Sequence, residues 1–117
     1  MAKFLFVYRR RGDAVEKMTR EQLAQNMKKW EKWIGAAMRK GWMLDPGDGL
    51  TQKGCVVNAK KVVIDGPFAE SKEIVGGFSI VQAGSLRAAA KLAKGCPGLL
   101  TGGTVEVRPL AGYTMKS

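Results

Sequence analysis

The run of residues 3–8 restricts the possible folds more than any other stretch, because it is apolar on both faces of a strand. Side chains alternate between the two faces. The two sets are Phe4, Phe6 and Tyr8 on one face, and Leu5 and Val7 on the other. A strand of this kind is covered on both sides, so we expect a helix on one face and a second sheet or subunit on the other. The arginines at 9–11 are expected to end the strand, either as a solvated loop or as an anion-binding cluster.

The segment after this strand predicts a long helix. Thr19 and Gln22 have the spacing of a capping box, and Gly41 supplies a stop signal, so the helix is expected to run to about residue 40. Its apolar stripe consists of Leu23, Met27, Trp30, Ile34, Ala37 and Met38. Trp33 falls at the margin of this stripe, where it shields the edge of the core, roofs a pocket or meets a partner.

The rest of the chain predicts further strands and a second helix. The turn cluster at 45–49 is expected to break a short strand. Gly76-Gly77, inside a later strand, suggests a bulge or the close approach of another backbone or a ligand. The predicted strands are residues 42–44, 55–57, 61–64, 74–82 and 104–108, with 55–57 and 61–64 paired as a hairpin, and the second helix is capped by Ser85 and ends at Gly95.

This order of elements predicts a ferredoxin-like α+β fold, an antiparallel sheet with two helices on one face. The other face would stay exposed in a monomer, where about five large apolar side chains at ~1.5–3 kcal/mol each favour burial. We therefore expect a homodimer that stacks the two sheets. The length predicts a single domain over residues 1–117, of which 110–117 form a flexible tail.

The chain contains no histidine, which excludes Ser/His/Asp and Cys/His nucleophilic schemes and removes the commonest metal ligand. Acid–base chemistry is left to carboxylates, lysine, tyrosine or cysteine. The two cysteines, Cys55 and Cys96, are expected to be buried or inert thiols rather than a disulfide. We expect neither a cofactor nor a metal.

The net charge of +10 permits attraction to nucleic acid, anionic lipid or an acidic substrate, although lysines that solvate helix faces also account for it. No apolar run approaches the ~20 residues that a membrane helix needs. The apolar run at 4–8 is too short for the core of a signal peptide. We expect a cytoplasmic protein that makes no membrane contact.

The loop over residues 65–73, Asp-Gly-Pro-Phe-Ala-Glu-Ser-Lys-Glu, and the Gly-Gly-Phe at 76–78 resemble the signature of the DGPF-domain proteins in the YCII-related family. The stretch 102–109 resembles that family's last strand, and Cys96-Pro97 stands where its members close their second helix. The resemblance implies a bacterial protein with a ferredoxin-like fold that forms a dimeric α/β barrel. Members are largely of unknown function, often suspected of enzymatic activity, and frequently encoded beside, or fused to, extracytoplasmic-function sigma factors.

The chain departs from this family pattern in two ways. Its second helix carries Arg87, Lys91 and Lys94, where many relatives are acidic. It also lacks the histidine that some relatives pair with an aspartate as a proposed catalytic dyad. The dyad mechanism therefore does not transfer directly.

The signature loop supplies most of the candidate site residues. Asp65 or Glu70 is the candidate general base, with a pKa raised by burial, while Lys72 or an arginine would hold an anionic substrate. The candidate substrate-binding residues are Arg10, Tyr8, Trp33, Phe68 and Lys72. The alternative is structural: Asp65 caps the turn, the later charges form salt bridges, and Phe68 anchors the core or an interface.

Three functions compete. The first is a small-molecule enzyme or binder, which predicts a cavity lined by Asp65, Arg10, Trp33 and Tyr8. The second is a regulatory protein that acts with a sigma factor. The third is nucleic-acid binding through the basic surface, which the chain supports poorly because it has neither interleaved exposed aromatic residues nor a known reading motif.

Overall fold

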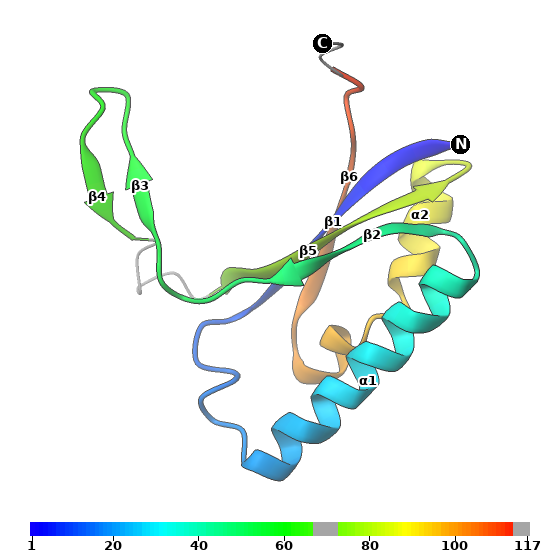
Figure 1. Ribbon diagram of the computed structural model, residues 1–117, viewed down its shortest axis with the longest axis horizontal. Helices are drawn as coiled ribbons and strands as arrows, with labels where there is room; N and C mark the ends of the chain where they lie inside the picture. Colours follow the sequence, from blue (N-terminus) through cyan, green and yellow to red (C-terminus); the bar gives the residue numbers. More distant parts are fainter. Residues whose placement is uncertain (67–72, 114–117) are drawn as a thin grey trace.

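Four strands form one antiparallel sheet, and two helices pack against one of its faces (Figure 1). The computed structural model describes residues 1–66 and 73–113. The elements are β1 (Ala2–Arg11), α1 (Arg20–Arg39), β2 (Met43–Gly49), β3 (Cys55–Val57), β4 (Val63–Asp65), β5 (Glu73–Ala83), α2 (Leu86–Ala93), the 3₁₀ helix η1 (Pro97–Thr101) and β6 (Thr104–Pro109). The sheet has the order β2-β5-β1-β6, and β3 pairs with β4 separately. The fold is α+β, as predicted, and the sheet of one chain is open rather than a closed barrel.

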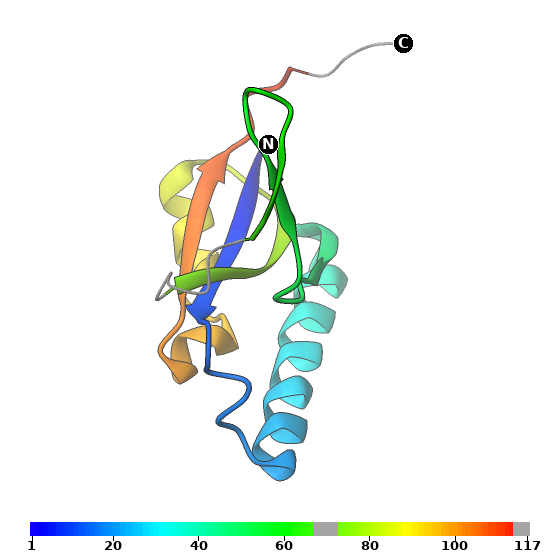
Figure 2. The ribbon, with the colours of Figure 1, turned by 90° about the vertical axis from the view of Figure 1, so that its left-hand side faces the viewer.

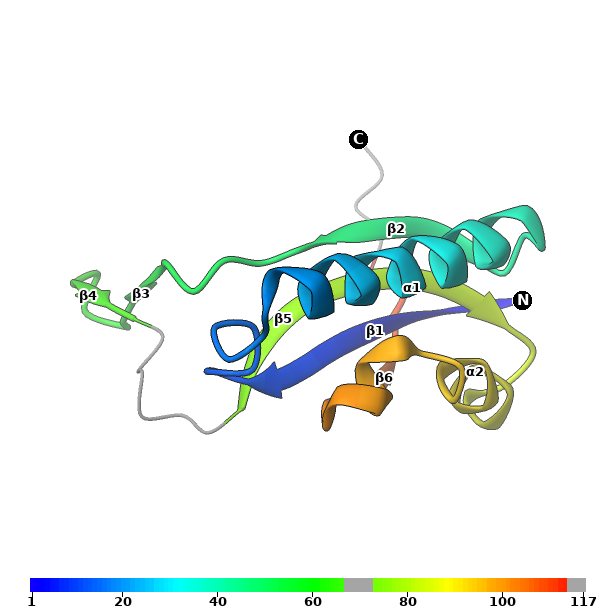
Figure 3. The ribbon, with the colours of Figure 1, turned by 90° about the horizontal axis from the view of Figure 1, so that it is seen from below.

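The alternation along β1 decides which face of the sheet forms the core. Phe4, Phe6 and Tyr8 are buried and pack with small buried residues of both helices, Ala37 of α1 and Ala89 and Ala93 of α2. Leu5 and Val7 point to the opposite face, where they stand across from Ile80 and Phe78 of β5. Both helices therefore cover the Phe4 face, and Figure 3 shows them side by side across the sheet. We call the opposite side, with Leu5, Val7, Phe78 and Ile80, the open face.

Helix α1 begins as its capping box predicts. The backbone N–H of Gln22 donates to Thr19 Oγ1 at 3.1 Å, and the backbone N–H of Thr19 donates to Gln22 Oε1 at 3.0 Å. The predicted apolar stripe was partly wrong, because Met27 and Met38 are 55% and 42% exposed. Trp33, expected at the margin of the stripe, is partly buried and packs against the core, as the core-shielding alternative predicts. The helix is rotated so that its large aromatic side chains, rather than its methionines, contact the sheet.

The three tryptophans belong to one aromatic cluster with two residues of β1. Trp33 has its ring centroid 5.9 Å from that of Trp30 and 5.7 Å from that of Trp42. Tyr8 meets Trp30 edge-on at 4.8 Å, and Phe6 lies 6.3 Å from Trp42. Aromatic pairs in edge-to-face geometry, as in all of these except the tilted Phe6–Trp42 pair, each add about 0.5–1.5 kcal/mol beyond the area that they bury. The cluster fixes α1 and the start of β2 on the sheet.

The prediction that a turn cluster breaks the second strand at residue 45 was wrong, because β2 continues to Gly49. Its pairing with β5 is irregular, with register shifts on both sides of Asp45. The side chain of Asp45 accepts from the N–H of Gly47, as in a turn. An edge strand tolerates such interruptions and a proline, since one of its sides makes no ladder bonds. The turn chemistry is present, but inside a bulged strand.

The glycine pair in β5 produces the predicted bulge and close backbone approach. The pairing of β1 with β5 shifts between Tyr8 and Arg9, opposite Gly77 and Val75. A Cβ atom on Gly77 would lie 2.8 Å from the carbonyl oxygen of Asp48, so only glycine lets β2 approach this closely. The arginines at 9–11 were expected to end β1, but they remain in it, because β5 offers partners as far as Glu73.

Strands β3 and β4 form the predicted hairpin, which we call the arm (residues 55–65). Figures 1 and 3 show it standing apart from the sheet, and Figure 2 views the molecule from the side of the arm. After β5, Ser85 caps α2 by accepting from the N–H of Ala88 at 3.0 Å. The helix η1 follows at Pro97 and was not predicted. No helix within residues 1–66 and 73–113 combines the length and apolar character needed to cross a membrane.

Candidate ligand-binding cleft

A cleft of about 630 Å³ opens where β1 ends and β5 begins. Its walls come from α1, the irregular part of β2, the glycine pair of β5, and the chain around η1. The volume lies within the range of small-molecule sites. A second hollow of about 480 Å³, at the opposite end of the sheet beside Trp42 and Lys91, is more open to solvent. The first cleft is the better candidate site because more polar groups converge in it.

The wall near the sheet is aromatic and held in place by buried hydrogen bonds. The hydroxyl of Tyr8 donates to Ser79 Oγ at 2.8 Å. The hydroxyl of Ser79 in turn donates to the carbonyl of Pro46 at 2.7 Å. Burial raises the pKa of Tyr8 well above its ordinary value, although the bond to Ser79 opposes this. Tyr8 therefore stays protonated at neutral pH. With Trp30 it offers the cleft a fixed aromatic surface rather than a base.

Arg10 brings a positive charge to the cleft. Its guanidinium donates to the backbone carbonyls of Arg11 at 3.2 Å and Gly12 at 3.4 Å. The aliphatic part of the Arg10 side chain packs against Gly76. A Cβ atom added to Gly76 would lie 3.1 Å from Nε of Arg10. Within the described part of the chain, Arg10 forms no ion pair with a carboxylate. Among those residues, the guanidinium therefore contacts backbone carbonyls and keeps its net charge.

The neighbouring arginines are paired. Arg9 Nε lies 3.0 Å from a carboxylate oxygen of Glu106, and Arg11 Nε lies 3.5 Å from one of Asp13. Hydrogen bonds from Arg108 and Arg9 hold the pKa of Glu106 below its usual value. Of the three arginines, Arg10 is the one that no described carboxylate neutralises.

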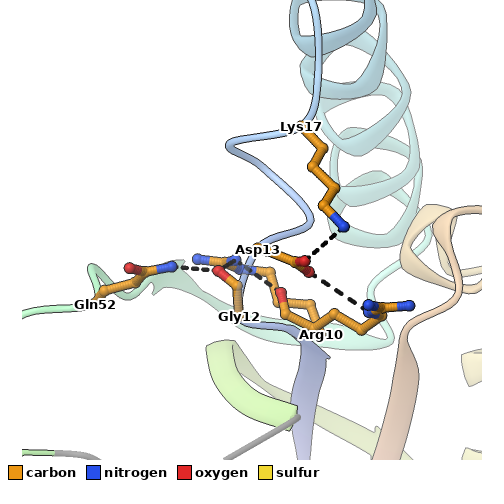
Figure 4. A network of polar contacts seen from close by, with 6 residues as sticks. Arg10, Gly12, Asp13, Lys17 and Gln52 are labelled. Atoms are coloured by element: carbon orange, nitrogen blue, oxygen red, sulfur yellow. Dashed lines mark hydrogen bonds and ion pairs between the residues drawn. The ribbon is translucent and has the colours of Figure 1, made fainter. Parts of the chain in front are cut away.

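The loop after β1 is anchored on two sides (Figure 4). Lys17 Nζ lies 2.8 Å from Asp13, and this hydrogen bond is the main reason that the pKa of Asp13 is lowered. The side-chain amide of Gln52 donates to the carbonyl of Gly12 and joins the loop to the segment between β2 and β3. These contacts restrict the backbone whose carbonyls hold Arg10.

The structure brings together some of the sequence-predicted site residues. Of the four expected to line one cavity, Tyr8 and Arg10 do so. Trp33 lies behind that wall, with its ring centroid 6.2 Å from that of Tyr8. Asp65 lies in the exposed arm and does not line the cleft. Three further predicted residues, Phe68, Glu70 and Lys72, lie outside the described residues.

Sequence reasoning missed the carboxylates that do line the cleft, Glu31 of α1 and Asp48 of β2. Asp48 accepts from the N–H of Gly49 at 2.7 Å. Glu31 resembled an ordinary solvated helix residue, and Asp48 resembled a turn residue, so neither carried a functional signal. The described residues contain no group of three or more cysteine, aspartate or glutamate side chains placed to hold a metal ion.

Cys96, at the floor of the cleft, was predicted to be a buried or inert thiol. It is a free cysteine, 2% exposed, and burial raises its pKa to about 11. At pH 8 the reactive thiolate is on the order of 0.1% of the population. In a Cys55→Ser variant, Cys96 should therefore react with a maleimide at least about 100-fold more slowly than free cysteine. The rate, followed by mass spectrometry, should rise with pH towards 11.

Unfolding the same variant in urea provides the control, because the exposed thiol should then react at an ordinary rate. A folded protein labelled as quickly as free cysteine would contradict the buried position of Cys96.

Comparison with known families places the chain beside one of them. The sequence model of the YCII-related domain family matches residues 2–113. None of the curated proteins matches the chain.

Proposed function

The chain belongs to the YCII-related domain family, and from this premise we propose that it binds a small anionic molecule in the cleft beside Arg10. The observation that carries the proposal is the guanidinium of Arg10, which lines the cleft without a carboxylate partner in the described residues. A guanidinium binds a carboxylate or phosphate through charge-assisted, often bidentate, hydrogen bonds.

The other walls define the rest of the ligand. Tyr8 and Trp30 suit a flat, apolar body, because aromatic rings pack edge-on or offset against one another. Asp48 and Glu31 can accept hydrogen bonds from hydroxyl or amino groups. The ligand class is therefore an aromatic or unsaturated acid with a hydroxyl or amino substituent. Conversion of such a ligand would use these two carboxylates as bases, since Asp65, a base predicted from the sequence, does not line the cleft.

We also propose that two copies form a homodimer through their open faces, with the ferredoxin-like plan expected from the sequence. The strand order β2-β5-β1-β6 supports this plan. Leu5, Val7, Phe78 and Ile80 are only partly buried in one chain. Covering them would contribute on the order of 1.5–3 kcal/mol for each side chain that becomes fully buried.

Replacing Arg10 tests the ligand site. We expect a thermal-shift screen of benzoate, hydroxybenzoates, aminobenzoates and phenyl phosphate to give at least one compound that stabilises the wild-type chain. Calorimetric titration of that compound should show affinity about 10- to 100-fold lower for Arg10→Gln, because a hydrogen bond to a charged group contributes about 1.5–3 kcal/mol.

Arg108→Gln is the matched control. It removes the same charge from an exposed ion pair on β6 that does not line the cleft, and it should leave the affinity unchanged. Equal losses in both variants would point to general charge attraction instead of a site. Unchanged affinity in Arg10→Gln would exclude Arg10 as the anchor.

A further inference from the structure

The strands of the arm carry exposed aliphatic residues but pack against little of their own chain. Its two strands pair only with each other among the described strands. Val57 and Val63, which stand opposite each other, are both 63% exposed. Val56 and Ile64 form the pair on the other side and are 44% and 38% exposed. Both sides of the arm therefore present aliphatic side chains to solvent.

The arm is nevertheless a regular hairpin. Asn58 closes its turn, since its side-chain oxygen accepts from the N–H groups of Lys60 at 2.9 Å and Val62 at 3.0 Å. At the other end, the N–H of Gly66 extends the ladder by donating to the carbonyl of Gly54 at 3.2 Å. An isolated two-stranded hairpin is at best marginally stable in water. Valine on both sides of such an element indicates that another surface covers it.

The position of the arm identifies that surface. Figure 1 shows the arm on the side of the sheet away from α1, beyond the end where β5 begins. The same side carries the open face, with Leu5, Val7, Phe78 and Ile80. The radius of gyration is 15.8 Å, compared with about 13 Å for a compact chain of roughly this length. The arm and the open face thus border one uncovered space.

We infer that the arm packs on a second copy of this chain, against the open face of that copy, and that the two copies exchange arms. A two-fold axis makes the exchange reciprocal, so each chain covers its partner's exposed aliphatic residues with its own. A stable complex buries about 800 Å² on each partner, and the arm and the open face together bring two aliphatic surfaces per chain to one interface. The inference rests on the homodimer proposed above and adds that the arm is the element that stabilises this dimer.

Cross-linking from the arm provides a direct test. A photoreactive benzoylphenylalanine replaces Val63 in two batches of protein, one unlabelled and one labelled with ¹⁵N. The batches are mixed, refolded together and irradiated. We expect cross-linked peptides that join a light arm to a heavy β1 or β5 segment, found by mass spectrometry. The same residue in place of the exposed Lys29, on the outer side of α1, should give no such mixed pair.

Charged substitutions in the arm provide the second measurement. Val57→Lys/Val63→Lys should raise the dimer dissociation constant, measured by light scattering over a dilution series, by at least about tenfold. If the variant dimerises as tightly as the wild type, and the cross-links form only within single chains, the arm exchange is wrong while the stacking of the open faces can still hold. A wild-type chain that is monomeric at about 100 µM, a concentration about 100-fold above a micromolar Kd, would overturn both. Ligand binding is decided separately by Arg10→Gln.

Discussion

Gly47→Ala is expected to lower the free energy of unfolding by about 3–5 kcal/mol, a large loss for a single methyl group. Gly47 has a φ of +63°, which an alanine adopts only with strain. A Cβ atom at this position would also lie 1.9 Å from the carbonyl oxygen of Phe78. Because that oxygen belongs to the backbone of β5, the clash is relieved only if β2 moves away from the sheet. Equilibrium unfolding in urea measures the loss.

Substitutions at two other glycines distinguish the cost of backbone strain from the cost of the steric clash. Gly41 has a φ of +81°, but an added methyl group there would meet no atom within 4 Å, so Gly41→Ala should cost about 1 kcal/mol. Gly84 has neither feature, and Gly84→Ala should be neutral or stabilise by up to about 1 kcal/mol. If Gly47→Ala costs no more than Gly41→Ala, the close contact between β2 and β5 is wrong.

The same substitution should also weaken ligand binding. The carbonyl that accepts from Ser79 belongs to Pro46, directly before Gly47, and Ser79 in turn holds the hydroxyl of Tyr8. A displaced β2 would break this chain of hydrogen bonds and move Asp48 in the cleft wall. The local backbone conformation of β2 is thus linked to the shape of the proposed site.

Phe6→Ala should cost about 3–5 kcal/mol of the roughly 5–15 kcal/mol that stabilise a domain. Phe6 is completely buried and contacts Tyr8 and Trp42 in the aromatic cluster, with ring centroids at 6.4 and 6.3 Å. Truncation would leave a cavity between the sheet and the helices, which the close-packed aromatic neighbours cannot fill. The measurement is again urea unfolding, with an unchanged dependence on denaturant expected.

Phe6→Leu is the matched control, because it keeps most of the apolar volume and should cost less than about 1.5 kcal/mol. Should alanine and leucine prove equally harmful, the loss would arise from the ring contacts and not from the cavity.

Local signals in the sequence predicted the fold well. Thr19 and Gln22 lie within one turn of each other, so their capping box depends on nothing else in the chain. The alternation along β1 likewise identified two apolar faces. It left open which of them the helices cover, because both sets are large and apolar. That choice depends on the small residues of α1 and α2, which fit against Phe4 and Phe6.

The candidate site was less accessible from sequence, because its residues meet only through strand register. Asp48 reaches the cleft because β2 continues through its turn signals along Gly77, and Glu31 reaches it through the rotation of α1. Neither event has a local signature. Arg10 was predicted as an anion-binding residue, but only the pairing of Arg9 and Arg11 with carboxylates distinguishes it from its neighbours.

The aromatic cluster has an optical consequence. All three tryptophans of the chain belong to it, with Trp30 at the cleft and Trp42 beside the hollow at the far end of the sheet. Centroid separations of 5.9 and 5.7 Å link them to Trp33, so excitation is shared among the three indoles. The intrinsic fluorescence of this protein is therefore a single collective reporter of its helix–sheet interface, and an event at either end changes the same emission.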